Sequence, residues 1–478
     1  MKKKNKNIAG KIITVLQLIV SVICIVVAKN SGLFPRKYLT LFIVGLGFLF
    51  VLTHVFQYPK SKILRYVGML TSLVIIIVLA GISVELMKAD DFIKKVGGAS
   101  YKTDNMIVVV KKEDTAKDIM DAQNYRFGYQ TIVDVDNTEK MLKDIRSTVG
   151  RNIKTEEYST LIDEANALLN GNIDAAVFNE GYLSIIDDSV EGFSDQVKIL
   201  YQYGIKTKVE NDTVADVNKP FNIYISGIDT SGAVSTVSRS DVNLILTVNM
   251  NTHKILMTTT PRDSYVRIPD GGADQYDKLT HAGIYGIETS VKTLENLYDI
   301  PINYYARLNF TSFVKLINAL GGVTVYNDQA FTSLHGNYNF GVGNINLTSG
   351  EEALGFVRDR YSLEHGDYDR GNNQLKVIQA IVEKLTSFQS VSNYSDVIST
   401  LQDSIQTNMP LNTMMSLVNE QLDSGKTFIF SSQEVTGTGS TGQLTSYAMP
   451  NASLYMIQLD DASVAKASQA IKNVMEGK

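Results

Sequence analysis

The stretch FNIYISGIDT, residues 221–230, marks the point at which the chain changes character. Apolar residues alternate along it, which is typical of a β-strand, and Asp229 follows directly after the apolar part. Open α/β sheets bind their ligands beyond the carboxyl ends of the strands. We therefore expect this strand to begin the main domain of an α/β protein, with Asp229 at the ligand-binding edge of the sheet.

The next two predicted strands also carry charged residues at their ends. SRSDVNLILTVNM (238–250) brings Arg239 and Asp241 into the second strand, and KILMTTTPRDSYVRIP (254–269) ends its apolar part at Pro261-Arg262-Asp263. A featureless surface would more often carry lysine, glutamate, threonine and serine there. These charges therefore indicate a candidate site, although structural ion-pair networks gather charges in the same way.

Helix and strand patterns alternate further along the chain. A loop and an amphipathic helix are predicted over 277–300, with Lys278 and His281 at the beginning, and strand, helix and strand over 302–325. A single histidine is more often a structural hydrogen-bonding residue than a catalyst. Arg307 lies on the predicted strand and faces either a ligand or solvent.

The run VRDRYSLEHGDYDRGNNQ, residues 357–374, is mixed in charge, and such runs are usually solvated surfaces. A helix is predicted over 347–360, capped by Thr348 or Ser349, and an amphipathic helix over 373–385. Arg370 and Gln374 share a face, at spacing i, i+4, if that second helix already includes Arg370. The acidic residues of the run are expected to orient its arginines, or one of them to act as a base: Asp359, Asp367 and Asp369.

Five arginines thus lie at predicted strand or helix ends: Arg239, Arg262, Arg358, Arg360 and Arg370. The planar guanidinium binds phosphate with two parallel hydrogen bonds and stays charged. Asp229 and Asp241 are suited to Mg²⁺, which uses one or two carboxylates together with substrate phosphates. The residue types favour a pyrophosphate site no more strongly than an ion-pair network. No P-loop, HExxH motif or nucleophile elbow is present.

Three apolar stretches near the N-terminus predict a membrane anchor, over residues 8–28, 38–56 and 63–86. A cleaved signal peptide fits less well, because two further stretches follow the first at once. The start of the chain and the second loop together carry more lysine and arginine than the first loop. This bias predicts a cytoplasmic N-terminus and places the rest of the chain outside the cell; the opposite orientation is the alternative.

The segment between anchor and main domain predicts a small α/β unit with a mostly parallel sheet. Strands are expected at 105–110, 127–132 and 174–178, and helices at 113–122 and after residue 156. The segment is either a spacer or interaction unit without chemistry, or a relative of one lobe of periplasmic solute-binding proteins. We expect domains at 1–90, 98–215 and 216–478, with residues 386–478 completing the last one.

The bulk composition excludes some classes of function. The net charge is −5, which gives no sign of a nucleic-acid-binding domain. The single cysteine, Cys24, lies in an apolar run and permits neither an intramolecular disulfide nor a thiolate metal cluster.

Several motifs together resemble the LytR-CpsA-Psr family: GIDTSG, SRSDVNLILTVN, TTPRDSYV, KLTHAGIYG, INALGGVTV and ALGFVRDR…DYDRGNNQ. The resemblance covers about residues 221–385, and the three-span anchor with an extra domain looks like the streptococcal capsule-biosynthesis (CpsA-like) branch. It implies an α/β/α sandwich with a central mixed sheet and an apolar pocket for a polyprenyl chain. Many members have arginine before the glutamine, where this chain has Asn373, so one cationic contact of the family is in doubt.

The resemblance also implies a function: transfer of a glycopolymer, here capsular polysaccharide, from a polyprenyl-pyrophosphate carrier to peptidoglycan outside the membrane. It implies Mg²⁺ as cofactor, Asp229, Asp241, Arg262 and Arg370 as catalytic residues, and other capsule-assembly proteins as partners. The residues implied to hold the pyrophosphate are Arg239, Arg262, Arg358, Arg360, Arg370 and Gln374. A polyprenyl-pyrophosphate phosphatase and a non-catalytic membrane regulator are the alternatives. A transcription factor fits poorly, because the short basic tail predicted before the first span offers no recognition helix.

Overall fold

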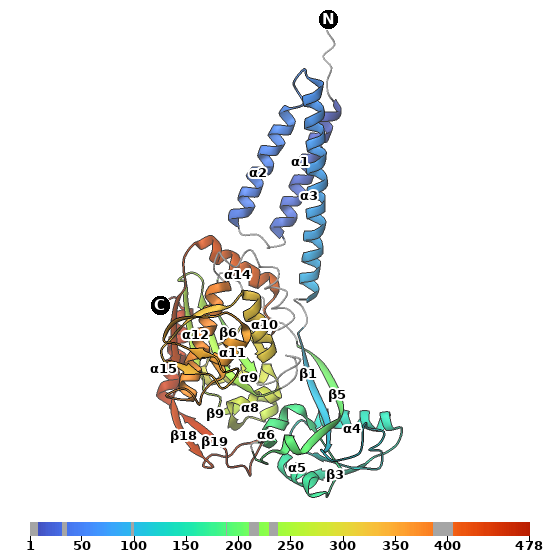
Figure 1. Ribbon diagram of the computed structural model, residues 1–478, viewed down its shortest axis with the longest axis vertical. Coiled ribbons are helices and arrows are strands. Elements are labelled where there is room, and N and C mark those ends of the chain that lie inside the picture. Colours follow the sequence, from blue (N-terminus) through green and yellow to red (C-terminus); the bar gives the residue numbers. More distant parts are fainter. Residues whose placement is uncertain are drawn as a thin grey trace. The chain divides into compact units, whose positions relative to one another are not determined.

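The computed structural model describes residues 8–30, 36–96, 100–187, 189–209, 219–228, 238–385 and 405–478 (Figure 1). Its chain forms two compact units. The first comprises residues 1–98, 386–388 and 409–427, and the second comprises residues 99–385, 389–408 and 428–478.

The first unit contains three long apolar helices that lie side by side: α1 (Ile8–Asn30), α2 (Arg36–Val55) and α3 (Lys62–Val96) (Figure 1). All three are long and apolar enough to cross a membrane, as expected from the three apolar stretches of the sequence. Between α1 and α2, the buried Thr53 Oγ1 donates a hydrogen bond to Gln17 Oε1 at 2.8 Å. Helix α14 (Leu411–Ser424) belongs to the same unit.

In the second unit, the segment after the anchor forms a five-stranded sheet of order β3-β2-β4-β1-β5. The expected mostly parallel pairing is wrong. Strand β2 is parallel to β3 and β4, but β1 is antiparallel to both β4 and β5. Two consecutive strands can pair in parallel only when a crossover connection joins them, and β1 is followed by turns and not by a helix. The strands are β1 (Ser100–Lys111), β2 (Arg126–Gln130), β3 (Lys154–Tyr158), β4 (Ala175–Asn179) and β5 (Val197–Val209).

The helix expected at 113–122 is absent, and these residues form turns. Asp114 and Asp118 accept hydrogen bonds from the backbone N–H groups two residues further on, at 2.7 and 2.9 Å. Aspartate side chains that bind nearby backbone in this way compete with helix formation. The helices of this segment are α4 (Val135–Val149), α5 (Leu161–Asn170), α6 (Leu183–Asp187) and α7 (Phe193–Gln196).

The main sheet has six strands in the order β16-β11-β6-β7-β8-β17. It is mixed, because β6 is parallel to β11 and antiparallel to β7, and β8 is antiparallel to β7 and parallel to β17. The strands are β6 (Phe221–Ile228), β7 (Ser240–Asn249), β8 (Lys254–Thr259), β11 (Tyr304–Asn309), β16 (Gln406–Thr407) and β17 (Ile429–Glu434).

Helices cover both faces of this sheet, which confirms the α/β/α sandwich. On one face Tyr224, Ile245 and Tyr305 pack in a core with α9 (Ile287–Tyr298) and α15 (Asp461–Met475). Leu308 points to the opposite face, because side chains alternate along a strand, and packs there with α10 (Phe310–Leu320), α11 (Gly350–Arg358) and α12 (Asp367–Leu385).

Local sequence signals fix the ends of these helices. The Asn309 side chain accepts a hydrogen bond from Ser312 N at 2.9 Å at the start of α10. Gly321 ends that helix at φ 70°, a conformation that favours glycine. Ser349 caps α11 by accepting from Glu352 N at 3.2 Å.

The segment after the anchor and the main domain share one hydrophobic core. Phe178 and Tyr182 pack with Ile284, Met449 and Met456. The smaller elements of the main domain are β9 (Tyr265–Ile268), β10 (Gln275–Lys278), α8 (Leu279–Ala282), β12 (Val323–Asn327), β13 (Phe331–Thr332), β14 (Asn339–Phe340), β15 (Gly343–Leu347), β18 (Gly437–Thr441) and β19 (Tyr455–Leu459).

Candidate functional site

One edge of the main sheet collects the charges predicted for the second and third strands. The pairings Ile228↔Ser240, Leu244↔Thr259 and Asn309↔Ile228 place the ends of β6, β8 and β11 beside the beginning of β7. Strand β7 begins at this edge, whereas β6, β8 and β11 end there. Residues at the beginning of β7 therefore lie beside residues that follow the other strands.

Asp241 and Arg262 meet at this edge, as the sequence suggested. Arg262 Nη1 lies 3.0 Å from Asp241 Oδ2, and Thr280 Oγ1 donates to Asp241 Oδ1 at 3.0 Å. The side chains of Arg262 and Asp241 remain 24% and 19% exposed, respectively. Both are thus held in place and still accessible from solvent.

A lysine joins this group, to which the sequence assigned no role. Lys278 Nζ lies 2.6 Å from Asp263 Oδ1, and Arg262 Nε lies 3.8 Å from the other oxygen of the same carboxylate. The Lys278 side chain is 10% exposed. The motif KLTHAGIYG contains this lysine, so the signal was present, but only the fold shows that it adds a second cation beside Arg262.

Arg358 reaches the same edge from α11. Its guanidinium carbon lies 4.0 Å from the centre of the Phe310 ring, and Phe310 follows directly after the end of β11. Strands β11 and β7 are two strand spacings apart, about 10 Å. The structure therefore brings Arg358 to the edge that holds Asp241 and Arg262, although these residues are far away in the sequence.

Helix α12 begins early enough to include Arg370, so Arg370 and Gln374 share a face as predicted. Gln374 Nε2 donates to Val357 O at 3.3 Å, next to Arg358. Asn373, at the position where the resemblance led us to expect an arginine, is buried, and its Nδ2 donates to Phe356 O at 3.5 Å. Its amide serves the packing of α12 on α11.

Two acidic residues of the charged run bind backbone groups and a glutamine side chain. Asp359 is buried and accepts hydrogen bonds from Leu334 N at 2.7 Å and Ser362 N at 2.9 Å. Asp369 accepts from Gln329 Nε2 at 2.7 Å and His365 N at 2.9 Å. These carboxylates fasten the loop between α11 and α12 to the segment after β12. The side chain of Asp367 is outside the described part of the chain.

The remaining predicted residues differ in how far they can be placed. Arg239 lies immediately before β7, at the same edge, and is partly buried. Arg360 follows α11, and its guanidinium carbon lies 4.5 Å from the centre of the Tyr361 ring. Asp229 lies outside the described residues.

Arg307 faces neither ligand nor solvent. It is 1% exposed, Nη2 donates to Ser238 O at 3.4 Å, and Nε has no hydrogen-bond partner among the described residues. Burial lowers the pKa of Arg307 to about 10. Ser238 precedes Arg239, so this buried cation supports the backbone that leads into the site.

His281 is structural, as the sequence favoured. Its Nδ1 lies 2.8 Å from Asp277 Oδ1, and both side chains are buried. Asp277 also accepts from Ser446 Oγ at 2.6 Å and Ala448 N at 2.8 Å. Burial acts to raise the pKa of Asp277, but His281 and these hydrogen bonds outweigh it and lower the pKa overall. The cluster fastens α8 to the C-terminal part of the domain.

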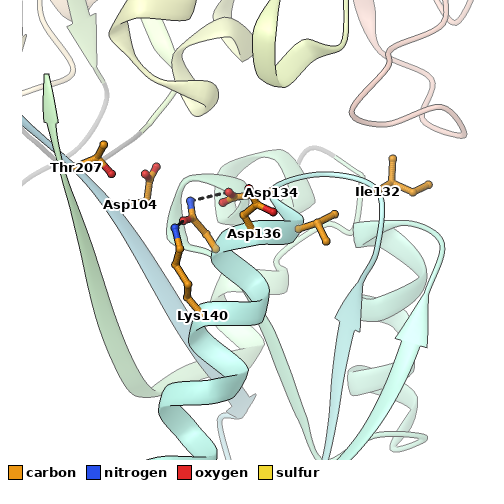
Figure 2. A pocket seen from close by; sticks show the side chains of 8 residues that line it. Asp104, Ile132, Asp134, Asp136, Lys140 and Thr207 are labelled. Atoms are coloured by element: carbon orange, nitrogen blue, oxygen red, sulfur yellow. Dashed lines mark hydrogen bonds between the residues drawn. The ribbon is translucent and has the colours of Figure 1, made fainter. Parts of the chain in front are cut away.

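A hollow of 440 Å³ lies in the five-stranded segment. Figure 2 shows the side chains that line it, beside the first turn of α4. Asp104, Asp134, Asp136 and Lys140 line it, and none of the predicted site residues does. Its acidic lining differs from the arginine-rich edge of the main sheet. We assign no chemistry to it.

The described residues contain no group of three or more histidine, cysteine, aspartate or glutamate side chains suited to a metal. A single carboxylate such as that of Asp241 is nevertheless compatible with Mg²⁺, which needs only one or two carboxylates besides phosphate oxygens. A carboxylate oxygen has two lone pairs, so the hydrogen bonds from Arg262 and Thr280 leave acceptor capacity on each oxygen of Asp241.

Comparisons with known proteins agree with the motifs. A sequence model of the LytR-CpsA-Psr family matches residues 188–463. The polyisoprenyl-teichoic acid–peptidoglycan teichoic acid transferase TagU of Enterococcus faecalis is 34% identical over 56% of this chain and 86% of its own length. TagU of Halalkalibacterium halodurans is 31% identical over 58% of this chain and 88% of its own. The crystal structure of Bacillus subtilis TagV covers 54% of this chain and 98% of its own, with 25% identity and a TM-score of 0.47.

Proposed function

This chain belongs to the LytR-CpsA-Psr family, and on that premise we propose that it transfers a glycopolymer from a polyprenyl-pyrophosphate carrier to peptidoglycan. The observation that carries the proposal is the edge of the main sheet, where Arg262 pairs with Asp241 at 3.0 Å while both stay accessible. The names of the relatives, teichoic acid transferases acting on peptidoglycan, support the same class of reaction.

The cations of this edge suit a pyrophosphate. Arginine binds phosphate oxygens through its planar fork, and positioned cations stabilise the charge that spreads over a transferring phosphoryl group. Arg262 and Arg370 contribute to catalysis in this proposal, and Lys278 supplies a further charge. The residues that hold the pyrophosphate are Arg239, Arg262, Arg358, Arg360, Arg370 and Gln374.

The reaction balances without any other reactant. A peptidoglycan hydroxyl oxygen forms a bond to the phosphorus that carries the sugar, and the bond from that phosphorus to the bridging oxygen breaks. Polyprenyl phosphate leaves, and a phosphodiester links glycan and peptidoglycan. Asp229 or Asp241 accepts the hydroxyl proton, since a general base must lie within hydrogen-bond reach of the attacking group.

Mg²⁺ is the cofactor that we propose, and Asp229 and Asp241 are its candidate protein ligands: the aspartate that does not serve as the base would hold the metal together with phosphate oxygens. Bound there, it would neutralise part of the negative charge of the pyrophosphate. Removal of divalent cations with EDTA should abolish transfer, and Mg²⁺ should restore it. Retention of full transfer in EDTA would contradict the metal assignment.

The polymer and the orientation are also proposals. We propose capsular polysaccharide as the polymer, since the three-span anchor and the five-stranded segment resemble the capsule branch of the family. Teichoic acid, the polymer named for the relatives, is the competing substrate. The lysine and arginine bias supports an extracellular catalytic domain, at the membrane surface where a lipid carrier presents its head group.

The test uses the full-length protein in lipid nanodiscs with a polyprenyl-pyrophosphate-linked glycan and peptidoglycan fragments. Mass spectrometry should detect a phosphodiester-linked product, with capsular glycan transferred faster than teichoic acid. Arg262→Ala should lower the rate about 100-fold, while Arg267→Ala, a matched exposed arginine on β9, should not. Release of free glycan phosphate as the sole product despite acceptor would show a phosphatase. Normal rates in Arg262→Ala and Arg370→Ala would favour a regulator without turnover.

A further inference from the structure

An exposed aromatic ring lies beside one of the arginines assigned to the pyrophosphate. Tyr361 is 72% exposed, and the guanidinium carbon of Arg360 lies 4.5 Å from its ring centre. Arg360 Nη2 also donates a hydrogen bond to the Tyr361 hydroxyl. The ring and the cation therefore form one unit, in which the position of the guanidinium fixes the position of the ring.

The loop that carries this ring is fastened on both sides. Asp359 binds the backbone of Leu334 and of Ser362, directly after Tyr361. Further along, Gln329 Oε1 accepts from Glu364 N at 3.0 Å, and Gln329 Nε2 donates to Asp369 at 2.7 Å. These hydrogen bonds join the loop at both ends to the segment that follows β12. The exposure of Tyr361 is thus a property of a braced loop.

A second large apolar side chain is exposed on the segment to which this loop is fastened. Leu334 is 67% exposed, and its backbone N–H binds the same carboxylate, Asp359, that binds Ser362. Single exposed apolar side chains are ordinary at a protein surface, so the feature that points to a ligand is the arginine stacked on the exposed Tyr361 ring. We call Leu334 and Tyr361 the apolar shelf.

We propose that the apolar shelf stacks against the sugar that is joined directly to the pyrophosphate of the donor. A pyranose ring presents a face of C–H groups, and these carry partial positive charge that complements the negative face of an aromatic ring. A sugar joined to a phosphate that binds Arg360 comes within reach of Tyr361, because Arg360 stacks on that ring. This inference rests on the proposed function and assigns Tyr361 as a positioning residue for the donor.

The shelf contributes sugar contact, whereas the arginines contribute phosphate contact, and binding measurements separate the two. The probes are a synthetic polyprenyl pyrophosphate carrying one glucose and the same lipid pyrophosphate without sugar. Dissociation constants are measured with the full-length protein in nanodiscs for wild type, Tyr361→Ala and Tyr361→Phe. Tyr326→Ala is the matched control, since Tyr326 is 55% exposed on β12.

Tyr361→Ala should weaken binding of the glucose-carrying donor roughly ten-fold and leave binding of the sugar-free lipid within about two-fold of wild type. Tyr361→Phe should retain donor binding, because it keeps the ring, and Tyr326→Ala should behave as wild type. Equal weakening of both probes would show that Tyr361 only supports Arg360 and would overturn the proposal. So would unchanged binding of both probes.

The acceptor sugar is the competing occupant of the shelf, and kinetics separate it from the donor sugar. If Tyr361→Ala raises the KM for peptidoglycan fragments while donor binding is unchanged, the shelf serves the acceptor, and the donor assignment is wrong. If wild type binds neither lipid, the proposed function itself fails, and the shelf assignment fails with it. Failure of the shelf alone leaves wild-type transfer intact.

Discussion

Replacing Arg307 by methionine should stabilise the fold while lowering transfer. Arg307 is 1% exposed, and the hydrogen bond that it makes to Ser238 O is a long one of 3.4 Å. Burial lowers the pKa of Arg307 more strongly than the charges of Glu288 and Asp104 raise it, so the buried cation remains costly. Methionine removes the charge, is unbranched, and adapts to irregular space in a core.

The size of the gain follows from the protonation equilibrium. Burial lowers the pKa of Arg307 to about 10, and a shift of one pKa unit corresponds to about 1.4 kcal/mol of free energy. Keeping the buried guanidinium charged at neutral pH therefore costs about 3 kcal/mol. The hydrogen bond to Ser238 offsets about 1 kcal/mol of this. We expect the free energy of unfolding of Arg307→Met to rise by about 2 kcal/mol.

Urea unfolding of the full-length protein in detergent micelles, followed by far-ultraviolet circular dichroism, measures this change. Arg307→Lys is the control, because it keeps the charge and shortens the reach to Ser238; it should be less stable than wild type. Transfer should fall in both variants, since the backbone before Arg239 loses its support. A methionine variant that unfolds at lower urea than wild type would refute the view that the charge is poorly compensated.

Three further predictions concern single side chains. Arg262→Lys should lower transfer at least about ten-fold, since lysine lacks the planar fork, whereas Arg267→Lys should not; equal rates would argue against bidentate phosphate binding. Burial raises the pKa of Glu164 well above 4.5. The protonated side chain therefore contributes fully to stability below pH 4.5, and this contribution is lost as the pH rises through the raised pKa. Glu164→Gln should flatten the dependence of the urea midpoint on pH above 4.5, and an unchanged slope would contradict this. Asp277→Asn should lower the free energy of unfolding by about 3 kcal/mol, whereas Asp299→Asn, at an exposed position, should leave it almost unchanged. If calorimetry gave Asp277→Asn the melting temperature of wild type, the proposed fastening role would be excluded.

Periodicity and local chemistry determined much of this fold from the sequence. The three long apolar helices, the strand β6 and the cap of α11 are confirmed, because each depends on neighbours within a few residues. The expected helix at 113–122 failed for a local reason as well: the side chains of Asp114 and Asp118 bind backbone groups that a helix would use. The strand directions of the five-stranded segment failed because pairing depends on connections and not on the strands themselves.

The charged residues show the boundary between sequence and structure most clearly. The sequence alone identified Asp241, Arg262 and Arg358 as candidates, since arginines and acids recur at predicted strand and helix ends. Only the tertiary structure decided which of the charges meet, because strand order and register set the distances between them. It joined Lys278 to the group, turned Asp359 and Asp369 into loop fastenings, and buried Arg307. Residue type determines what a side chain is able to bind, whereas burial and neighbours, which come from distant parts of the chain, decide what it does bind.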